Sequence, residues 1–247
     1  MSRHPLEVQG AKSEKRFLQP RAEIFRPTPT SIAFVAISTG GKTSQMLTVA
    51  NHLYPIMDRI VLFSSSHKLD PAWTDLKEKV AARNIARGEH PDTHPFTFTN
   101  LTKLDQVIQE QVHRVMEAKE NDEKHIPALM VILDDLLGSM KFSAQLDALV
   151  TRGRHAGISV LASTQVYRGL SQAQRKNFAG WCLGKMAAVD WKVFEDEHAG
   201  SFVTRDELRR LYARATAQKY GFLYYRPRSG DVENMFYSSF TEKLVPT

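Results

Sequence analysis

The sequence predicts an α/β fold in which a mainly parallel sheet is covered by helices on both faces. Three stretches dominated by apolar residues have the length of buried strands, namely Ile32–Ile37, Ala128–Asp135 and Ile158–Gln165. Segments with apolar residues at helical spacing alternate with these stretches. Strands that are apolar on both sides and alternate with helices are typical of a parallel sheet between two helical layers.

The first half of the chain supplies three strands and three helices to this fold. After the strand Ile32–Ile37, apolar residues from Met46 to Leu53 recur at helical spacing, and Arg59–Ser64 has the composition of a second strand. Asp70–Ile85 is predicted to be a helix with Asp70 as its N-cap and Pro71 in its first turn. A brief strand at Phe96–Phe98 precedes a long helix capped by Asn100, and that helix has a buried face formed by Leu101, Leu104, Ile108, Val112 and Val115.

The second half continues the alternation and then changes character. Between the strands Ala128–Asp135 and Ile158–Gln165, a helix is expected with a buried stripe of Phe142, Leu146, Leu149 and Val150. Phe178–Leu183 is predicted to be the last core strand. In the rest of the chain, helices are predicted at Trp191–His198 and Thr204–Ala217. They are followed by a predicted hairpin that pairs Phe222–Tyr225 with Glu233–Phe240.

These elements divide the chain into three predicted parts. Residues 1–30 form an N-terminal arm, because they are mixed in charge, contain four prolines and show no sustained periodicity. Apolar residues of the arm could dock it on the body or on a neighbour, namely Phe17, Leu18, Ile24 and Phe25. Residues 31–188 form the core, and residues 189–247 form a C-terminal extension of helices and a hairpin that packs on the core.

Composition limits the class of protein. The 247 residues carry a net charge of +6, and 42% are hydrophobic, which is enough for one sizeable core. The single cysteine, Cys182, excludes an intrachain disulfide and a cysteine zinc cluster. No apolar stretch has the length of a membrane span, so we expect a soluble, intracellular protein.

Positive charge is concentrated between Lys141 and Lys185. This stretch contains seven Lys or Arg residues and one acid, so its surplus equals the net charge of the whole chain. The stretch is either a solvated basic face or a contact for a polyanion.

A phosphate-binding loop is predicted where the first strand meets the first helix. The loop and the start of the helix contain Ser38, Thr39, Gly40, Gly41, Lys42, Thr43 and Ser44. Glycines allow backbone N–H groups to close around an anion, and the helix N-terminus adds partial positive charge. Lys42 is then placed to reach the outer phosphates, and Thr43 to ligate Mg²⁺. The alternative is a glycine-rich turn with an incidental lysine, and one departure from the full pattern is Ala36 in place of a glycine.

Two other strands end in groups that complement a phosphate site. Asp134 and Asp135 follow one apolar run, and Gln165 ends another. Ligands of open parallel sheets bind at the carboxyl ends of the strands. Asp134 is a candidate metal ligand, and Asp135 is a candidate base or orienting group for an attacking water. The alternatives are a helix cap or turn for the two acids and an ordinary polar strand end for Gln165.

Arg152 and Arg154 lie at the end of the helix before the Gln165 strand. An arginine can stabilise the charge that develops in phosphoryl transfer, and a neighbouring subunit can supply it. Basic residues also favour the C-terminus of a helix for purely electrostatic reasons, so both explanations remain open.

In this order, these motifs resemble the poxvirus-type genome-packaging ATPases of large double-stranded DNA viruses, within the FtsK–HerA group of P-loop motors. The resemblance extends from Ser31 to the C-terminus. It depends on residues 40–43, on residues 131–135, and most specifically on residues 149–160 followed by Ser163-Thr-Gln165.

The resemblance implies a P-loop NTPase fold with a RecA-like sheet. It also implies ATP and Mg²⁺ as cofactors, with Lys42 and Thr43 as nucleotide and metal contacts and Asp134 as the metal-coordinating acid. It further implies that Asp135 is the catalytic carboxylate, Gln165 a sensor, and one of Arg152 and Arg154 a finger acting across a ring interface. Asp135 departs from the family, because related motors often have Glu at this position.

The predicted function is therefore an ATP-driven double-stranded DNA translocase that forms a homo-oligomeric ring and packages a viral genome. The resemblance implies capsid or membrane-associated virion proteins as partners, at viral assembly sites or in the virion. Candidate DNA contacts follow Gln165 directly in the basic stretch, at Arg168, Arg175 and Lys176. Two alternatives remain: a small P-loop kinase, and a nucleotide-binding assembly protein that does not hydrolyse its ligand.

Overall fold

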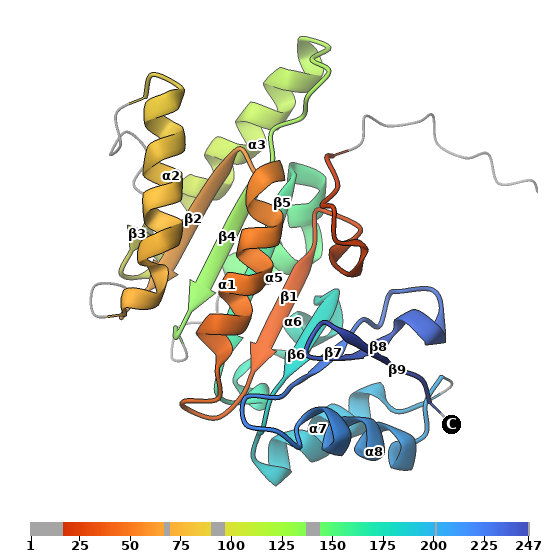
Figure 1. Cartoon of the computed structure of the whole chain (residues 1–247). Helices are drawn as coiled ribbons and strands as arrows, with labels where there is room; N and C mark the ends of the chain where they lie inside the picture. Colours follow the sequence, from red (N-terminus) through yellow and green to blue (C-terminus); the bar gives the residue numbers. More distant parts are fainter. Residues whose placement is uncertain (1–16, 67–69, 90–96, 137–143, 201, 247) are drawn as a thin grey trace, which may run out of the picture.

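The predicted α/β fold is confirmed in a computed structural model that describes residues 17–66, 70–89, 97–136, 144–200 and 202–246 (Figure 1). The strands are β1 Ser31–Val35, β2 Arg59–Ser64, β3 Thr97–Phe98, β4 Leu129–Asp134, β5 Ile158–Thr164, β6 Gly180–Leu183, β7 Leu223–Tyr225, β8 Phe236–Ser238 and β9 Glu242–Leu244. The helices are α1 Lys42–Leu53, α2 Thr74–Ala86, α3 Leu104–Glu120, α5 Ala144–Arg152, α6 Gln172–Asn177, α7 Ala188–His198 and α8 Arg205–Ala215. Phe96, Lys141 and Phe142, named above, lie outside the described residues.

Among the described residues, nine strands join in one sheet, in the order β3-β2-β4-β5-β1-β6-β7-β8-β9. The strands from β3 to β6 are mutually parallel, and β7, β8 and β9 continue the sheet in antiparallel pairs. The order places β5 between β1 and β4, although β1 and β4 are far apart in sequence. The residues that follow β1, β4 and β5 therefore meet at one edge of the sheet.

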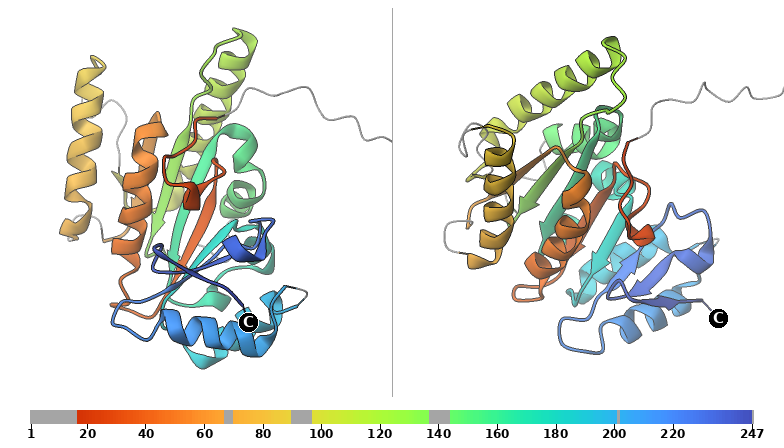
Figure 2. Two further views of the ribbon diagram at one scale, coloured as in Figure 1. Left: turned by 45° about the vertical axis from the view of Figure 1, so that its right-hand side comes forward. Right: turned by 45° about the horizontal axis from the view of Figure 1, so that its top comes forward.

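The two faces of the sheet explain the continuous apolar runs. Ile32 and Phe34 of β1 pack with α1 and α2 on one face, whereas Ala33 and Val35 belong to the core under α3, α5, α7 and α8 on the other. Figure 2 shows α1 and α2 on one side of the sheet and α3 on the other. Every residue of β1 is buried, because successive side chains point to opposite faces and both are covered.

Helix starts follow the predicted caps with one refinement. The carboxylate of Asp70 accepts a hydrogen bond from Ala72 N at 2.9 Å, and Asn100 accepts one from Thr102 N at 3.0 Å. In both cases the first turn is a 3-10 turn, Pro71–Trp73 or Leu101–Lys103, and the α-helix begins after it. Tightened first turns of this kind are common at helix ends.

The C-terminal hairpin is confirmed, but it extends the sheet further than the sequence indicated. β7 pairs with β8 as predicted, and it also pairs with β6, so β6 is not an edge strand. Within the predicted Phe178–Leu183, β6 is the last parallel strand, and the hairpin continues the sheet from it. β9 and the short helix α6 were not predicted, because three-residue strands and a single helical turn are too short to show a period.

The described part of the N-terminal arm docks through Phe25. This side chain is 2% exposed and contacts the ring of Phe240, with ring centroids 5.2 Å apart. Leu18 is more than half exposed and contributes little to the docking. Among the described helices, none combines the length and the apolar character that crossing a membrane requires.

Candidate functional site

The loop between β1 and α1 has the backbone conformation that a phosphate cradle needs. Gly41 is the N-cap of α1 with φ of 81°, and Thr39 has φ of 59°. Left-handed backbone costs a glycine almost nothing, whereas at Thr39 it is unusual. The loop lies beyond the carboxyl end of β1, at the lower end of α1 in Figure 1.

The alanine that replaces the first loop glycine is accommodated by two other glycines. A methyl group added to Gly40 would lie 2.7 Å from Cβ of Ala36, and one added to Gly184 would lie 2.8 Å from the same atom. Both distances are too short for real side-chain contacts. The Ala36 side chain therefore fills the space between positions 40 and 184, which must remain glycine around it.

Lys42 folds back over its own loop. Its Nζ donates hydrogen bonds to the carbonyl oxygens of Ala36, at 2.9 Å, and Ile37, at 3.1 Å. Burial lowers the pKa of Lys42, and the nearby carboxylates of Asp135 and Asp134 oppose that change. The ammonium is thus close to both acids and is held by carbonyls that a phosphate could replace.

Asp134 is fixed at the end of β4 by neighbours on two sides. Ser163 of β5 donates to its Oδ1 at 2.7 Å, and the indole of Trp73 donates to its Oδ2 at 3.2 Å. Thr43 lies beside the same Oδ2, with its hydroxyl at 3.5 Å. Burial raises the pKa of Asp134, the hydrogen bonds from Ser163 and Trp73 lower it, and the charge of Asp135 raises it.

Asp135 stands at the exposed side of this arrangement. It has a left-handed φ of 53°, which turns the chain away from β4 directly after Asp134. Its N–H donates to the Ser163 hydroxyl at 3.1 Å, and the amide of Gln165 donates to its Oδ1 at 3.5 Å. The three predicted strand ends are therefore brought together, with Gln165 between the phosphate loop and the acids.

Thr43 and Asp134 provide a suitable place for a magnesium ion. Both offer oxygen atoms, which Mg²⁺ prefers, and Mg²⁺ usually takes one or two protein ligands together with water and phosphate oxygens. Asp134 keeps its orientation through Ser163 and Trp73, as a metal-binding carboxylate does through its outer hydrogen bonds. The residues present therefore fit the ion.

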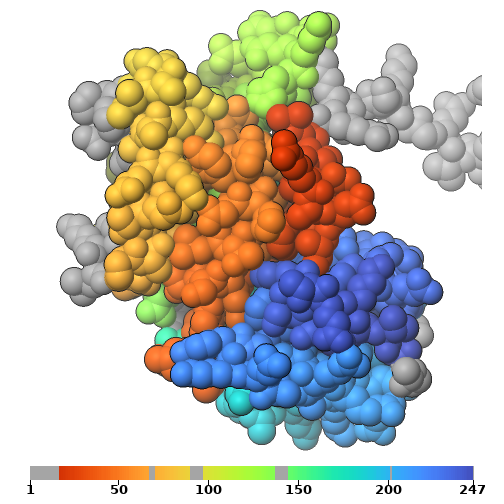
Figure 3. All heavy atoms as spheres, viewed as in Figure 1, coloured from red at the N-terminus to blue at the C-terminus, as the bar shows by residue number. Residues whose placement is uncertain are grey.

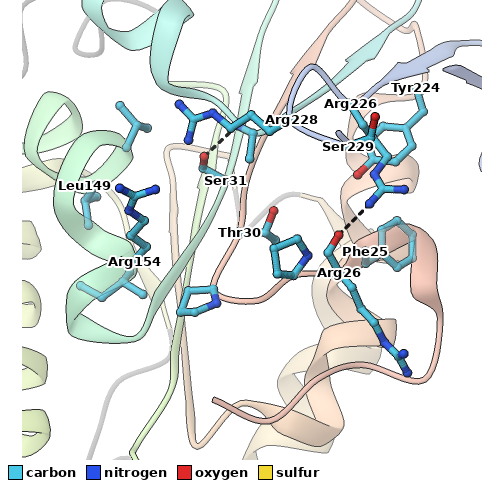
Figure 4. A pocket seen from close by; sticks show the side chains of 15 residues that line it. Phe25, Arg26, Thr30, Ser31, Leu149, Arg154, Tyr224, Arg226, Arg228 and Ser229 are labelled. Carbon is cyan, nitrogen blue, oxygen red and sulfur yellow. Dashed lines mark hydrogen bonds between the residues drawn. The ribbon is translucent and has the colours of Figure 1, made fainter. Parts of the chain in front are cut away.

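Arg152 and Arg154 lie elsewhere, at the turn that precedes β5. Both are exposed, and neither has an acidic partner among the described residues. Figure 4 shows Arg154 beside a cavity of about 160 Å³ that is also lined by Arg226 and Arg228. The seven residues of β5 separate this turn from Gln165, which corresponds to about 20 Å along the strand.

The three candidate DNA contacts differ in their exposure to solvent and in whether an acidic side chain pairs with them. Arg175 binds Glu197 through two nitrogens, at 2.9 Å and 2.7 Å, and its side chain is only 13% exposed. Arg168 is half-exposed, with its Nε 3.3 Å from Asp190 Oδ1. Lys176 is exposed. The charge of Arg175 is therefore largely neutralised inside the protein.

Sequence reasoning did not assign roles to Ser163 and Trp73, the two donors that hold Asp134. Ser163 gave one signal, because a serine in a strand that is buried on both faces needs a hydrogen-bond partner. Trp73 gave none, since it is 61 residues from Asp134 and meets it only through the packing of the 3-10 turn before α2.

Comparison with known structures identifies relatives of this fold. The genome packaging NTPase B204 from Sulfolobus turreted icosahedral virus 2, in complex with AMPPCP, superposes with a TM-score of 0.57 and 12% identity, covering 86% of this chain and 97% of that one. B204, the DNA-packaging ATPase from Sulfolobus turreted icosahedral virus, gives a TM-score of 0.54 and 15% identity, covering 85% and 96%. At these identities the likeness establishes the fold. A search of curated protein sequences gives no match to this chain.

Comparison with the sequence patterns of protein families identifies the family as well as the fold. The pattern of the family described as Poxvirus A32 protein matches residues 21–195, which include the phosphate loop, both acids and Gln165. The match covers well over half of the chain. The chain therefore belongs to the poxvirus A32 protein family, the genome-packaging NTPases that its motifs resemble.

Proposed function

We propose that this protein is an ATP-driven double-stranded DNA translocase that packages a viral genome. The observation that carries the proposal is the convergence of Lys42, Thr43, Asp134, Asp135 and Gln165 at one edge of the sheet. Related structures support it, because the B204 protein is named as a packaging NTPase and has been obtained in complexes with AMPPCP and ATP-gammaS.

ATP binding would begin with an exchange of partners at Lys42. The ammonium leaves the carbonyls of Ala36 and Ile37 and binds the outer phosphates, while the backbone of residues 38–44 surrounds them. Thr43 and Asp134 would hold Mg²⁺, which when bound neutralises the charge that develops on the phosphates. Asp134 is well suited to this role because its burial disfavours an uncompensated negative charge.

Hydrolysis requires a water aligned with the terminal phosphate. Asp135 is the carboxylate that is exposed and not committed to the metal, so it orients this water and accepts its proton. The Gln165 amide lies against Asp135 and is placed to contact the water or the phosphate. Loss of the phosphate then changes the surroundings of Gln165, which leads directly into the segment with Arg168.

A site completed by a second subunit explains the position of Arg152 and Arg154. Neither can reach the phosphate loop of its own chain from the other end of β5. In a ring, one of the two would enter the site of the next subunit and stabilise the transferring phosphoryl group. Head-to-tail contacts of this kind close into rings when the rotation between subunits allows it.

DNA contact is assigned to the exposed cations that follow Gln165. Lys176 is exposed, Arg168 is half-exposed and shares its charge with Asp190, and Arg175 supports the fold through Glu197. Lysine and arginine contacts of this kind bind phosphates without reading sequence. Capsid or membrane-associated virion proteins, and assembly sites in the infected cell, remain part of the proposal through the family alone.

The proposal is tested by measuring ATP hydrolysis with and without duplex DNA, for the wild type and for Asp135→Asn. We expect DNA to stimulate the wild type, and the variant to bind ATP but to hydrolyse it at least about a hundredfold more slowly. Lys42→Ala is the matched loss-of-binding control. Hydrolysis that responds to a small phosphate acceptor and ignores DNA would contradict the proposal.

A further inference from the structure

The phosphate loop forms only one wall of a larger cleft. The cleft has a volume of about 610 Å³, and residues 39–45 with Thr48 line one side of it. The opposite side comes from the C-terminal part of the chain, at Tyr220, Phe222, Ser239 and Phe240. Figure 3 shows this part (blue) against the lower end of α1 (orange). The phosphates bound at Lys42 and Thr43 would occupy only part of this cleft.

One buried side chain in the cleft has unused hydrogen-bonding groups. Gln45 is 5% exposed, and neither its Nε2 nor its Oε1 has a hydrogen-bond partner among the described residues. Buried amides are normally satisfied, so an unpartnered one lining a cleft indicates a ligand group that is missing. An amide offers one donor and one acceptor side by side, which matches the edge of a purine base.

An aromatic ring lies close to the same amide. A methyl group placed on Gly41 would be 3.5 Å from Cδ1 of Tyr220 and 3.8 Å from Nε2 of Gln45. The ring of Tyr220 and the unpartnered amide of Gln45 therefore both lie next to position 41, in the lining of the cleft. Tyr220 is 58% exposed, so much of its surface is available to a ligand.

Unusual backbone is concentrated around this cleft. Six non-glycine residues among those described have a positive φ, and four of them line the cleft: Thr39, Tyr220, Ser239 and Phe240. Such conformations are retained where the surrounding structure requires them, most often at ligand sites. The C-terminal segments are thus held in place over the loop at a cost in backbone strain.

We propose that this cleft is the nucleobase subsite, in which a purine ring stacks on Tyr220 and its edge binds the Gln45 amide. The inference rests on the proposed function, because it takes the triphosphate to lie over Lys42 and Thr43. The base then lies in the part of the cleft lined by Gln45, Thr48 and Tyr220. The ligand class is a purine nucleoside triphosphate, and the C-terminal segment supplies part of its site.

The test compares ATP with inorganic tripolyphosphate, which has the phosphates without the base. Binding of each to the full chain is measured by calorimetry for the wild type and for Tyr220→Gly, because glycine adopts the φ of 64° at this position freely. We expect the variant to bind ATP about tenfold more weakly, the loss typical of one stacked base, and to bind tripolyphosphate as the wild type does. Phe202→Ala, which removes another exposed aromatic, is the matched control.

Gln45→Leu tests the second half of the subsite. Leucine has a similar size and breaks no hydrogen bond among the described residues, so the fold should not suffer. We expect weaker ATP binding, unchanged tripolyphosphate binding, and a ratio of ATP to GTP affinity closer to one. Unchanged ATP affinity in both variants, or equal losses for ATP and tripolyphosphate, would overturn the subsite. A Lys42→Ala variant that kept full affinity for both ligands would instead refute the proposed function.

Discussion

Two pairs of arginines in the basic stretch differ in where their charge is used. Arg152 and Arg154 are exposed and have no acidic partner among the described residues. Arg168 and Arg175, on the other side of β5, each bind an acid of α7, at Asp190 and Glu197. The count of basic residues in the sequence treats all four alike, whereas the structure separates available cations from neutralised ones.

Arg175, the more buried of the two paired arginines, belongs to a polar cluster. Glu197 accepts hydrogen bonds from Arg175 and, at 2.7 Å, from the hydroxyl of Tyr167, which also lies 3.1 Å from His198 Nε2. Burial raises the pKa of Glu197, but the hydrogen bonds from Arg175 and Tyr167 lower it more, so it stays ionised. Burial lowers the pKa of His198 to about 4, so its ring is neutral at pH 7. These contacts tie the segment after Gln165 to α6 and α7.

The comparison separates two tasks that one basic stretch performs. Arg175 is tied to Glu197 in the interior, whereas Arg152 and Arg154 are exposed and have no acidic partner among the described residues. This free charge lies before β5, whereas the phosphate loop follows β1 at the opposite, carboxyl end of the parallel strands. Substitutions of the unpaired arginines should therefore affect ATP hydrolysis, and substitutions at the Arg175–Glu197 pair should affect stability.

The largest effect is expected at the unpaired pair. Of the variants Arg152→Ala and Arg154→Ala, we expect one to lose about a thousandfold or more in ATP hydrolysis, because its guanidinium acts on the next subunit. Mixing that variant with Asp135→Asn should restore part of the activity. In a mixed ring, some sites combine an intact Asp135 with an intact arginine from the neighbour.

Hydrolysis rates of each variant alone and of the mixture check this prediction. A mixture of Asp135→Asn with Lys42→Ala is the matched control, since both variants damage the same side of the site and should stay inactive. If the arginine variant and Asp135→Asn remained inactive together, the arginine would act within its own chain or only on the fold.

A smaller effect, on stability, is expected at the paired arginines. Glu197→Gln leaves Arg175 without its counter-charge in a site where the two side chains are 13% and 19% exposed. We expect the free energy of unfolding to fall by about 3 kcal/mol, the lower end of the range for a broken buried pair. Urea unfolding monitored by circular dichroism measures the change.

The neighbouring residue offers a matched control. Asp196 pairs with Arg205 at 2.6 Å, but both side chains are about half exposed. Asp196→Asn should therefore cost less than about 1 kcal/mol. Equal losses for the two variants would show that the Arg175–Glu197 pair does not hold the fold together.

The sequence predicted the fold and the core of the site because both depend on local patterns. Strands buried on both faces appear as continuous apolar runs, and β2 at Arg59–Ser64 was predicted to the residue. A polar group at the end of a buried strand is visible in sequence, as at Asp134 and Gln165. The topology of parallel strands then places these ends at one edge.

The remaining features depend on contacts between distant segments. Gln45 looks like an ordinary polar residue in the first turn of a helix, and only the structure shows that it is buried without a partner. Tyr220 lies 179 positions after Gly41, and nothing in the sequence indicates that they meet. Arg175 was predicted to contact DNA. The sequence does not show that its charge is taken up by Glu197, which lies 22 residues later and meets Arg175 only through the packing of α7.

The smallest expected effect concerns DNA, and it separates the cations that follow Gln165. Binding of a non-specific duplex weakens with salt, and the slope of log Kobs against log salt falls by about 0.9 for each DNA phosphate that the protein no longer neutralises. Lys176→Ala should show close to this full decrease, because the lysine is exposed. Arg168→Ala should show a smaller decrease, since Asp190 already takes part of its charge at 3.3 Å. Lys243→Ala, which removes an exposed lysine on β9, should leave the slope unchanged. If Lys176→Ala and Lys243→Ala changed the slope equally, the DNA contact would not lie after Gln165, and the difference between available and neutralised cations would not describe DNA binding.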